Sequence, residues 1–286
     1  MNPGTTLFGV SAALVWGTAD FTGGVSAKRA PAIAVVAIAH SSSLLLLLVW
    51  ALATRAPVVD AHSLIWGLSS GIAGSIGLIC FYRALSLGQM GLNAAVAGLI
   101  TAAIPVLFSF LRSGTPGAIQ LAGFALATLS IVLIAYTPGT SNNAARPKGL
   151  LLAIAAGIGF GILLLGLKFA STNGVLWPQI SARISSVIIA GAASFPLLRR
   201  RSEQRTRLLQ PATLALAVLA GVLDTAGNIL YMLATRAGRL DVAAMLSSLY
   251  PAATILLAHW LLKERTTRLQ TTGMVLALAA VALISI

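Results

Sequence analysis

The sequence predicts an all-α integral membrane protein with ten transmembrane helices, arranged as two inverted five-helix repeats. Three observations predict this fold class. Of the 286 residues, 58% are hydrophobic and only 9% are charged, whereas about one quarter of the residues are charged in soluble domains. Apolar segments of about 20 residues, the length that crosses the hydrocarbon core of a bilayer, recur along the chain. The second half of the chain also repeats part of the first half at a constant offset.

Ten apolar segments qualify as membrane spans. Each is too long and too uniformly apolar for a barrel strand, so it must be a helix that satisfies its own backbone groups in lipid. The breaks between the spans are short and contain turn residues or charges, so we expect no domain outside the membrane. The approximate limits of the spans are 5–24, 32–53, 64–85, 92–111, 118–136, 149–169, 177–198, 212–235, 242–262 and 269–285.

The charge distribution points to a lipid bilayer as the partner. The net charge of +13 comes from 19 Lys and Arg against 6 Asp and Glu. These bases form short clusters between spans, where Lys and Arg set orientation and meet anionic lipid, so we expect no nucleic acid partner. The single cysteine, Cys80, excludes a disulfide within the chain. We expect no cofactor and no metal site, and we expect a multi-pass protein of the cell (plasma) membrane.

An internal repeat appears when the chain is shifted by 150 residues. Between residues 81 and 134, 14 of 54 positions are then identical, including Gly88 with Gly238 and Gln120 with Gln270. We interpret this as a duplication, with one five-helix repeat at 1–138 and the second at 147–286. Because five is an odd number, the second repeat enters the membrane in the opposite sense to the first. Inverted repeats of this kind are typical of transporters that open a central site to each side in turn.

Two segments carry a resemblance to a known family. They are "VWGTADF" at 15–21 and "LSSLYPAATILLAHWLLKERTTRLQTTG" at 246–273, in which Pro251 is followed by Glu264 and then by Gln270. With these segments the chain resembles EamA-type permeases of the drug/metabolite transporter superfamily, which carry two five-helix repeats. The first repeat departs from the pattern, because Thr101 replaces the proline and Gly114 stands where the second repeat has Glu264. The resemblance does not fix a substrate.

The membrane orientation of the chain ends stays open. Five bases share a side with the N-terminus, and thirteen lie on the other side, so the positive-inside rule favours both termini outside. The resemblance implies both termini inside. The five bases are Arg55, Arg112, Lys168, Arg236 and Arg239.

Asp224 is an isolated acid in the eighth span. An acid at the bilayer centre costs about 2.5–3.5 kcal/mol on insertion scales, so it must face protein or a water-filled cavity. Asn228 and Tyr231 lie four and seven residues later, on the same helical face, and the three side chains are candidates for binding substrate. The alternative is a structural ion pair between Asp224 and one of two basic residues within spans, Lys168 and Arg183.

The first span offers a second candidate face. Trp16 and Asp20 are four residues apart and precede Gly23 and Gly24, which permit a close helix approach. We count Trp16 and Asp20 as substrate-binding candidates. Asp20 and Asp224 also form a hypothetical pair of proton carriers, one in each half.

Two prolines lie within spans. Pro105 and Pro251 each remove a backbone donor, so we predict a break in both helices. Near Pro251, the side chains of Ser247 and Tyr250 are further candidates for contact with substrate, although small residues at such positions also serve helix packing alone.

We therefore expect a secondary active transporter, or permease, for a small metabolite or drug. An integral membrane enzyme acting on a lipid-linked substrate is the first alternative, but it would be expected to have clustered acids or histidines, and the six acids of this chain are scattered. A non-transporting membrane scaffold is the other alternative. The sequence does not name the substrate, the direction of transport, the coupling ion or the oligomeric state. A homodimer is one possible oligomeric state.

Overall fold

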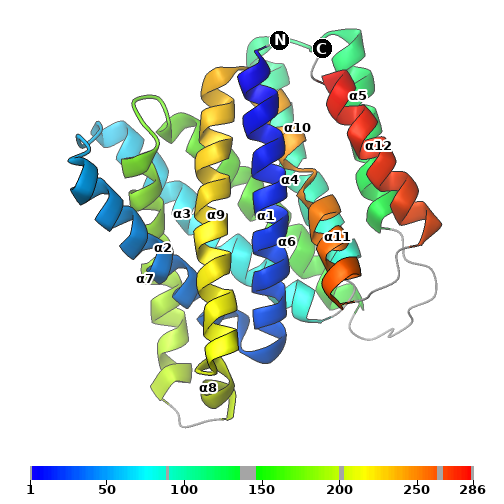
Figure 1. The fold of residues 1–286 in the computed structure, drawn as a ribbon. Helices are drawn as coiled ribbons and strands as arrows, with labels where there is room; N and C mark the ends of the chain where they lie inside the picture. The colour runs from blue at the N-terminus through cyan, green and yellow to red at the C-terminus, as the bar shows by residue number, and fades with distance from the viewer. Residues whose placement is uncertain (1, 88–89, 136–145, 200–202, 263–266, 285–286) are drawn as a thin grey trace.

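In a computed structural model, the chain folds as a bundle of α-helices (Figure 1). The structure describes residues 2–87, 90–135, 146–199, 203–262 and 267–284; Glu264, in the segment that carries the resemblance, lies outside them. No strand occurs in these ranges, which confirms the all-α class. The helices are α1 (Pro3–Arg29), α2 (Ala32–Thr54), α3 (Ala61–Ser86), α4 (Met90–Ser113), α5 (Ala118–Ala135), α6 (Arg146–Ala170), α7 (Leu176–Arg199), α8 (Glu203–Leu208), α9 (Pro211–Ala237), α10 (Leu240–Ser247), α11 (Tyr250–Leu262) and α12 (Arg268–Ile284).

The helices follow the predicted spans closely. Nine of the ten spans each lie on one helix, and two of these end at residues 136 and 285, outside the described residues. By length and hydropathy, six segments of the described chain qualify to cross a membrane, five of them in α2, α3, α4, α6 and α9. The sixth, Leu240–Leu261, contains α10 and most of α11. The protein is therefore a multi-pass membrane protein, while ten crossings and inverted repeats stay predictions.

The two prolines behave differently from each other. The ninth span is divided, because α10 ends at Ser247 and α11 begins at Tyr250. Pro251 is the second residue of α11, where a helix has no use for the missing N–H. Pro105 lies inside α4, which continues through it. The predicted break at Pro105 is wrong, since a proline removes one backbone hydrogen bond and the rest of the helix bridges the gap.

Helices from the two halves of the chain interleave. α1 packs along α9 and against α10 and α11, whereas α3 packs along α6 and against α7. α4 packs on α6, α2 packs on α7 and α9, and α5 packs on α12. The start of α1 and the end of α12 lie at one end of the bundle, which we call the termini end (Figure 1).

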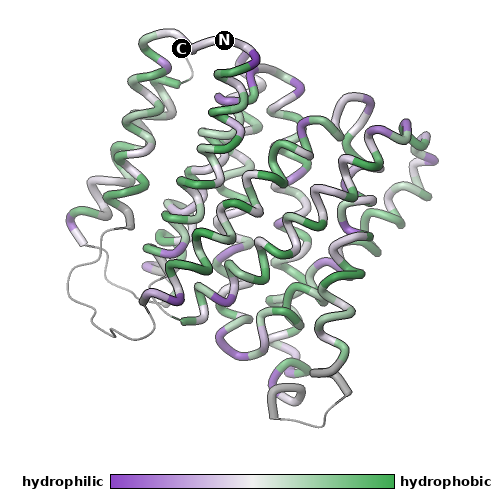
Figure 2. The backbone as a smooth tube through the Cα atoms, turned by 180° about the vertical axis from the view of Figure 1, so that it is seen from behind, coloured by the Kyte–Doolittle hydropathy of each residue, from purple (hydrophilic) through white to green (hydrophobic). Residues whose placement is uncertain are grey.

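Large apolar side chains project from the outside of the bundle. Leu52 is 77% exposed and Leu111 is 87% exposed, and many more such residues lie on outward faces. Hydrophobic residues run along the lengths of the helices, and many hydrophilic ones lie near helix ends (Figure 2). An apolar surface of this extent is unusual on a soluble protein and matches contact with lipid.

Asp60 caps the start of α3 and lies outside the membrane-spanning segments. Its carboxylate accepts hydrogen bonds from the amide of Asn173 at 2.6 Å, from the hydroxyl of Ser63 at 2.8 Å and from the backbone N–H of Ser63 at 3.1 Å. These bonds, that of Asn173 above all, favour the charged carboxylate and lower the pKa of Asp60 to about 2.

Candidate functional site

Asp224 of α9 forms an ion pair in the interior of the bundle. The guanidinium of Arg183, from α7, donates a hydrogen bond to the carboxylate of Asp224, and its Nε donates to the hydroxyl of Thr225 at 3.0 Å. Nε2 of His40, from α2, lies 3.8 Å from the same carboxylate. Arg183 is therefore the cation that offsets the charge of Asp224.

Lys168, the other basic residue considered as a partner of Asp224, lies elsewhere. It is near the end of α6, and its ammonium group donates a hydrogen bond to the backbone carbonyl of Thr235 at 2.8 Å. Arg236 makes a similar bond to the carbonyl of Ser171 at 2.9 Å. These bonds tie α6 to α9 at the termini end, because both helices end there.

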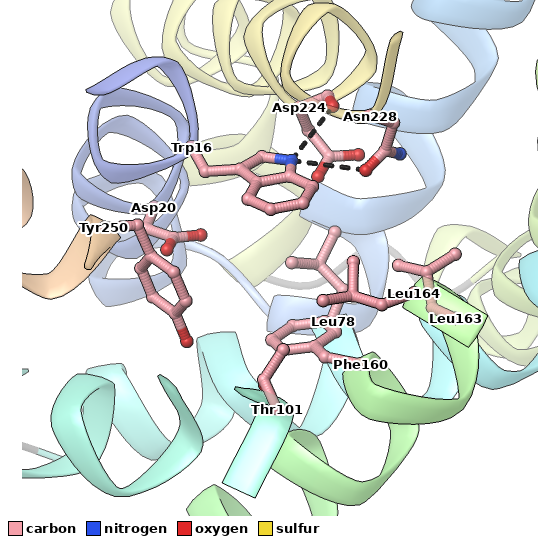
Figure 3. A pocket seen from close by; sticks show the side chains of 10 residues that line it. All are labelled: Trp16, Asp20, Leu78, Thr101, Phe160, Leu163, Leu164, Asp224, Asn228 and Tyr250. Atoms are coloured by element: carbon pink, nitrogen blue, oxygen red, sulfur yellow. Dashed lines mark hydrogen bonds between the residues drawn. The ribbon is translucent and has the colours of Figure 1, made fainter. Parts of the chain in front are cut away.

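Trp16 of α1 joins the same polar region from the opposite helix. Its indole N–H is shared between the backbone carbonyl of Asp224, at 3.3 Å, and Oδ1 of Asn228, at 3.2 Å (Figure 3). Its ring lies 5.8 Å from that of Tyr231. A β-carbon at Gly227 would lie only 2.4 Å from the indole ring, so α9 accepts Trp16 because it has glycine there.

A narrow cavity lies between two chemically different walls (Figure 3). Its free volume is about 30 Å³, which is room for about two waters. One wall comes from α1 and α9 and is polar, and we call it the polar wall; it consists of Trp16, Asp20, Asp224 and Asn228. The other comes from α3 and α6, and we call it the apolar wall; it consists of Leu78, Phe160, Leu163 and Leu164. Tyr250 and Thr101 complete the lining.

Asp20 differs from Asp224 in having no counter-ion. Its side chain lines the cavity, and the residue is only 7% exposed. Among the residues that the structure describes, nothing donates a hydrogen bond to it and no cation pairs with it. The buried hydroxyls of Tyr82 and Tyr250 have no hydrogen-bond partner in the same part of the chain. Unpartnered polar groups of this kind are costly, and they mark a site that a ligand or water completes.

Two predicted site residues do not reach the cavity. Tyr231 is fully buried behind Trp16, and Ser247 is fully buried at the end of α10. The hydroxyl groups of both lack a hydrogen-bond partner among the described residues. Of the predicted set, Trp16, Asp20, Asp224, Asn228 and Tyr250 line the cavity together.

The sequence reasoning missed the whole apolar wall. In a chain with 58% hydrophobic residues, a leucine that lines a cavity looks the same as one that faces lipid. The 150-residue offset was the available signal, because it pairs Leu78 with Asn228. No pattern in the sequence indicates that His40 lies beside Asp224. The hydroxyl of Ser43, three residues later, donates a hydrogen bond to the backbone carbonyl of His40 at 3.1 Å.

The part of the chain that the structure describes brings no three His, Cys, Asp or Glu side chains together as metal ligands. What remains is a buried, partly polar cavity with one paired and one unpaired carboxylate. A bundle of apolar helices around such a cavity defines a multi-pass membrane protein with an interior cavity that is a candidate site for a small molecule.

Comparison with known proteins identifies the class further. Residues 147–286 match the sequence model of the EamA-like transporter family, and the chain belongs to this family of the drug/metabolite transporter superfamily. The crystal structure of another protein aligns over 99% of this chain and 96% of that protein's chain, with a TM-score of 0.72 and 18% sequence identity. It shares the fold. No curated protein matches the sequence.

Proposed function

We propose that the protein is a secondary active transporter of the cell (plasma) membrane. It moves a small metabolite or drug by alternating access between two inverted repeats, at 1–138 and 147–286. Membership of a transporter family supports the general class. The observation that carries the mechanism is that glycines 150 positions apart in the two repeats make similar contacts with neighbouring helices.

The first pair of equivalent contacts joins helices by their backbones. Gly71 of α3 and Gly221 of α9 are 150 positions apart. A β-carbon at Gly71 would lie 2.0 Å from the carbonyl oxygen of Ala182 in α7, and one at Gly221 would lie 2.0 Å from the carbonyl oxygen of Ala39 in α2. The crossing of α3 on α7 therefore has its counterpart in the crossing of α9 on α2.

The second pair lies at the cavity itself. Gly77 and Gly227, again 150 positions apart, each have an aromatic ring packed on the place of the missing side chain. A β-carbon at Gly77 would lie 3.0 Å from the ring of Phe160, from α6. A β-carbon at Gly227 would lie 2.4 Å from the ring of Trp16, from α1. This correspondence makes the polar and apolar walls counterparts of each other, as expected for a site on a pseudo-two-fold axis.

The helices of the two walls also contact each other towards each end of the bundle. At the termini end, α6 and α9 are tied by the bond from Lys168 to the carbonyl of Thr235. At the opposite end, α1 meets α3, and the ring of Tyr82 occupies the space left by Gly23, within 2.1 Å of where a β-carbon would stand. The contact between α1 and α3 in the first half corresponds to the contact between α6 and α9 in the second half. Opening one contact while the other stays closed is an alternating-access cycle.

This mechanism is testable without knowledge of the substrate. In a Cys80→Ser background, Thr101→Cys places the only cysteine in the lining of the cavity. Its rate of reaction with a membrane-impermeant thiosulfonate is measured from each side of sealed vesicles. We expect reaction from both sides. Lys168→Met should raise the rate from the termini side and lower it from the other side, and Tyr82→Ala should do the reverse.

Lys28→Met is the matched control, since Lys28 is exposed at the end of α1 and takes part in neither contact. It should leave both rates unchanged. A protease-sensitive tag on one terminus identifies the termini side in each vesicle preparation. Access from one side only in every variant, or an equal rise from both sides in Lys168→Met, would contradict alternating access.

We also propose coupling to protons, through Asp20 rather than through both acids. The carboxylate of Asp224 is paired with the guanidinium of Arg183, whereas Asp20 has no cationic partner in the described structure. The ionisable groups that interact electrostatically with Asp20 are Asp224, Tyr82 and Tyr250. A transport rate that responds to an imposed pH gradient in wild type and in Asp20→Asn alike would exclude this role.

A further inference from the structure

We propose that the cavity, which has room for only about two waters in this structure, widens in the transport cycle and then binds an amphipathic monocation, an organic amine whose ammonium group pairs with Asp20 and whose apolar body lies on the apolar wall. This inference rests on the proposed transport function and adds the chemical class of the substrate. The charge of the site, the unpartnered groups around Asp20 and the character of the apolar wall each lead to it.

With the carboxylate of Asp20 ionised, the charges around the cavity sum to minus one. Asp20 and Asp224 contribute two carboxylates, and Arg183 contributes one guanidinium. The ring nitrogens of His40, which is 1% exposed, make no hydrogen bond, and a buried imidazolium without hydrogen bonds costs more than the neutral ring. A ligand with one positive charge neutralises the site.

The position of the unpaired charge is that of Asp20. Its carboxylate lies between the rings of Trp16 and Tyr250 at the edge of the cavity (Figure 3). An ammonium group placed there meets a carboxylate beside two electron-rich rings, and such rings attract cations within about 6 Å of the ring centre. The hydroxyl of Tyr250, which has no hydrogen-bond partner among the described residues, is an acceptor for an ammonium proton.

The rest of the cavity excludes other classes of solute. The apolar wall offers no hydrogen bonds, so a sugar or a nucleotide would leave many of its polar groups unsatisfied. An anion would be repelled by the carboxylate of Asp20. A zwitterionic amino acid requires a free cation for its carboxylate, but the guanidinium of Arg183 is already bonded to Asp224 and Thr225.

Four compounds of similar shape and different charge test the proposal: 2-phenylethylamine, 2-phenylethanol, 3-phenylpropionate and phenylalanine. Binding to the purified full-length protein in detergent is measured by isothermal titration calorimetry at pH 8. Because the alcohol and the acid lack the positive charge that pairs with Asp20, and the amino acid offsets it with a second charge, we expect the amine to bind about tenfold or more tightly than each of them. Equal binding of the alcohol, or tighter binding of the acid or the amino acid, would overturn the inference.

Variants locate the binding site. Asp20→Asn should weaken amine binding by about tenfold or more, and Asp20→Glu should restore most of it. Asp60→Asn removes an acid at the start of α3, away from the cavity, and should bind the amine as wild type does. Size-exclusion profiles and unfolding curves confirm that each variant is folded. Unchanged affinity in a folded Asp20→Asn protein would refute the role of this carboxylate.

Uptake of the same four radiolabelled compounds into proteoliposomes separates this inference from the proposed function. If the amine binds but none is taken up, the site stands and transport fails. If phenylalanine or the alcohol is taken up and the amine neither binds nor is taken up, transport stands and the assignment of an amine fails.

Discussion

Replacing Asp224 with asparagine removes the charge that holds the buried guanidinium of Arg183. The side chain of Arg183 is 4% exposed and that of Asp224 is 16% exposed, so bulk water can replace little of the lost interaction. Replacing Asp20 with asparagine removes a carboxylate that has no partner in the described structure. Two substitutions of the same kind should therefore differ in their effects on stability: Asp224→Asn should destabilise the protein and Asp20→Asn should not.

The magnitudes follow from burial. Removing one partner of a buried ion pair costs about 3–5 kcal/mol. Because Nε of Arg183 keeps its bond to the hydroxyl of Thr225 at 3.0 Å, we expect Asp224→Asn to lose about 3 kcal/mol, near the lower limit. Removing the second charge as well, in Asp224→Asn with Arg183→Gln, should recover about half of that loss. Asp20→Asn should equal wild type or exceed it by about 1 kcal/mol.

Free energies of unfolding are measured by titration with SDS in mixed micelles at pH 7, followed by far-UV circular dichroism. The four proteins are wild type, the two single variants and the double variant. A loss for Asp20→Asn as large as that for Asp224→Asn would show that Asp20 has a structural partner. No loss for Asp224→Asn would refute the ion pair as a stabilising contact.

Three further predictions use the same titration. Gly221→Ala places a methyl group against a backbone carbonyl of α2 and should cost about 2 kcal/mol or more, whereas Gly191→Ala, with no atom within 4 Å of the new carbon, should gain about 0.5–1 kcal/mol; equal effects would refute the close crossing. Trp16→Phe keeps an aromatic ring but leaves Oδ1 of Asn228 without its donor, and should cost about 1 kcal/mol; no loss would contradict this bond. The pKa of Asp60 is about 2, below the value of about 3.9 for an unfolded aspartate, so its stabilising charge acts fully above about pH 4 and is lost as the pH falls towards about 2. The stability difference between wild type and Asp60→Asn should shrink across that window, and a constant difference would exclude a lowered pKa.

Much of the fold follows from the sequence because a membrane restricts the choices. A segment of about 20 apolar residues has to be a helix in lipid, so nine predicted spans each lie on one helix. The break predicted near Pro251, in the ninth span, is confirmed, whereas the break predicted at Pro105, in the fourth span, is wrong. The difference lies in position, since a proline in the first turn of a helix costs no hydrogen bond, while one in the interior can be bridged by neighbouring turns.

The candidate site was predictable only in its charged part. The cost of a buried acid indicates that Asp20 and Asp224 face inwards. The choice of Arg183 over Lys168 as the partner of Asp224 depends on how α7 and α9 are rotated against each other, and helical periodicity within one span does not contain that information. The apolar wall could not be predicted, because its leucines have the same chemistry as those that face lipid.

Unequal walls in equivalent helices have a consequence for the resting state of a carrier. In an alternating-access cycle between identical inverted halves, the two open states would have the same energy by symmetry. Leu78 stands where the other half has Asn228, and Gly74 stands where it has Asp224. In the proposed cycle these differences would remove the degeneracy, so the empty protein would favour opening to one side of the membrane, and that side would set where substrate is first captured.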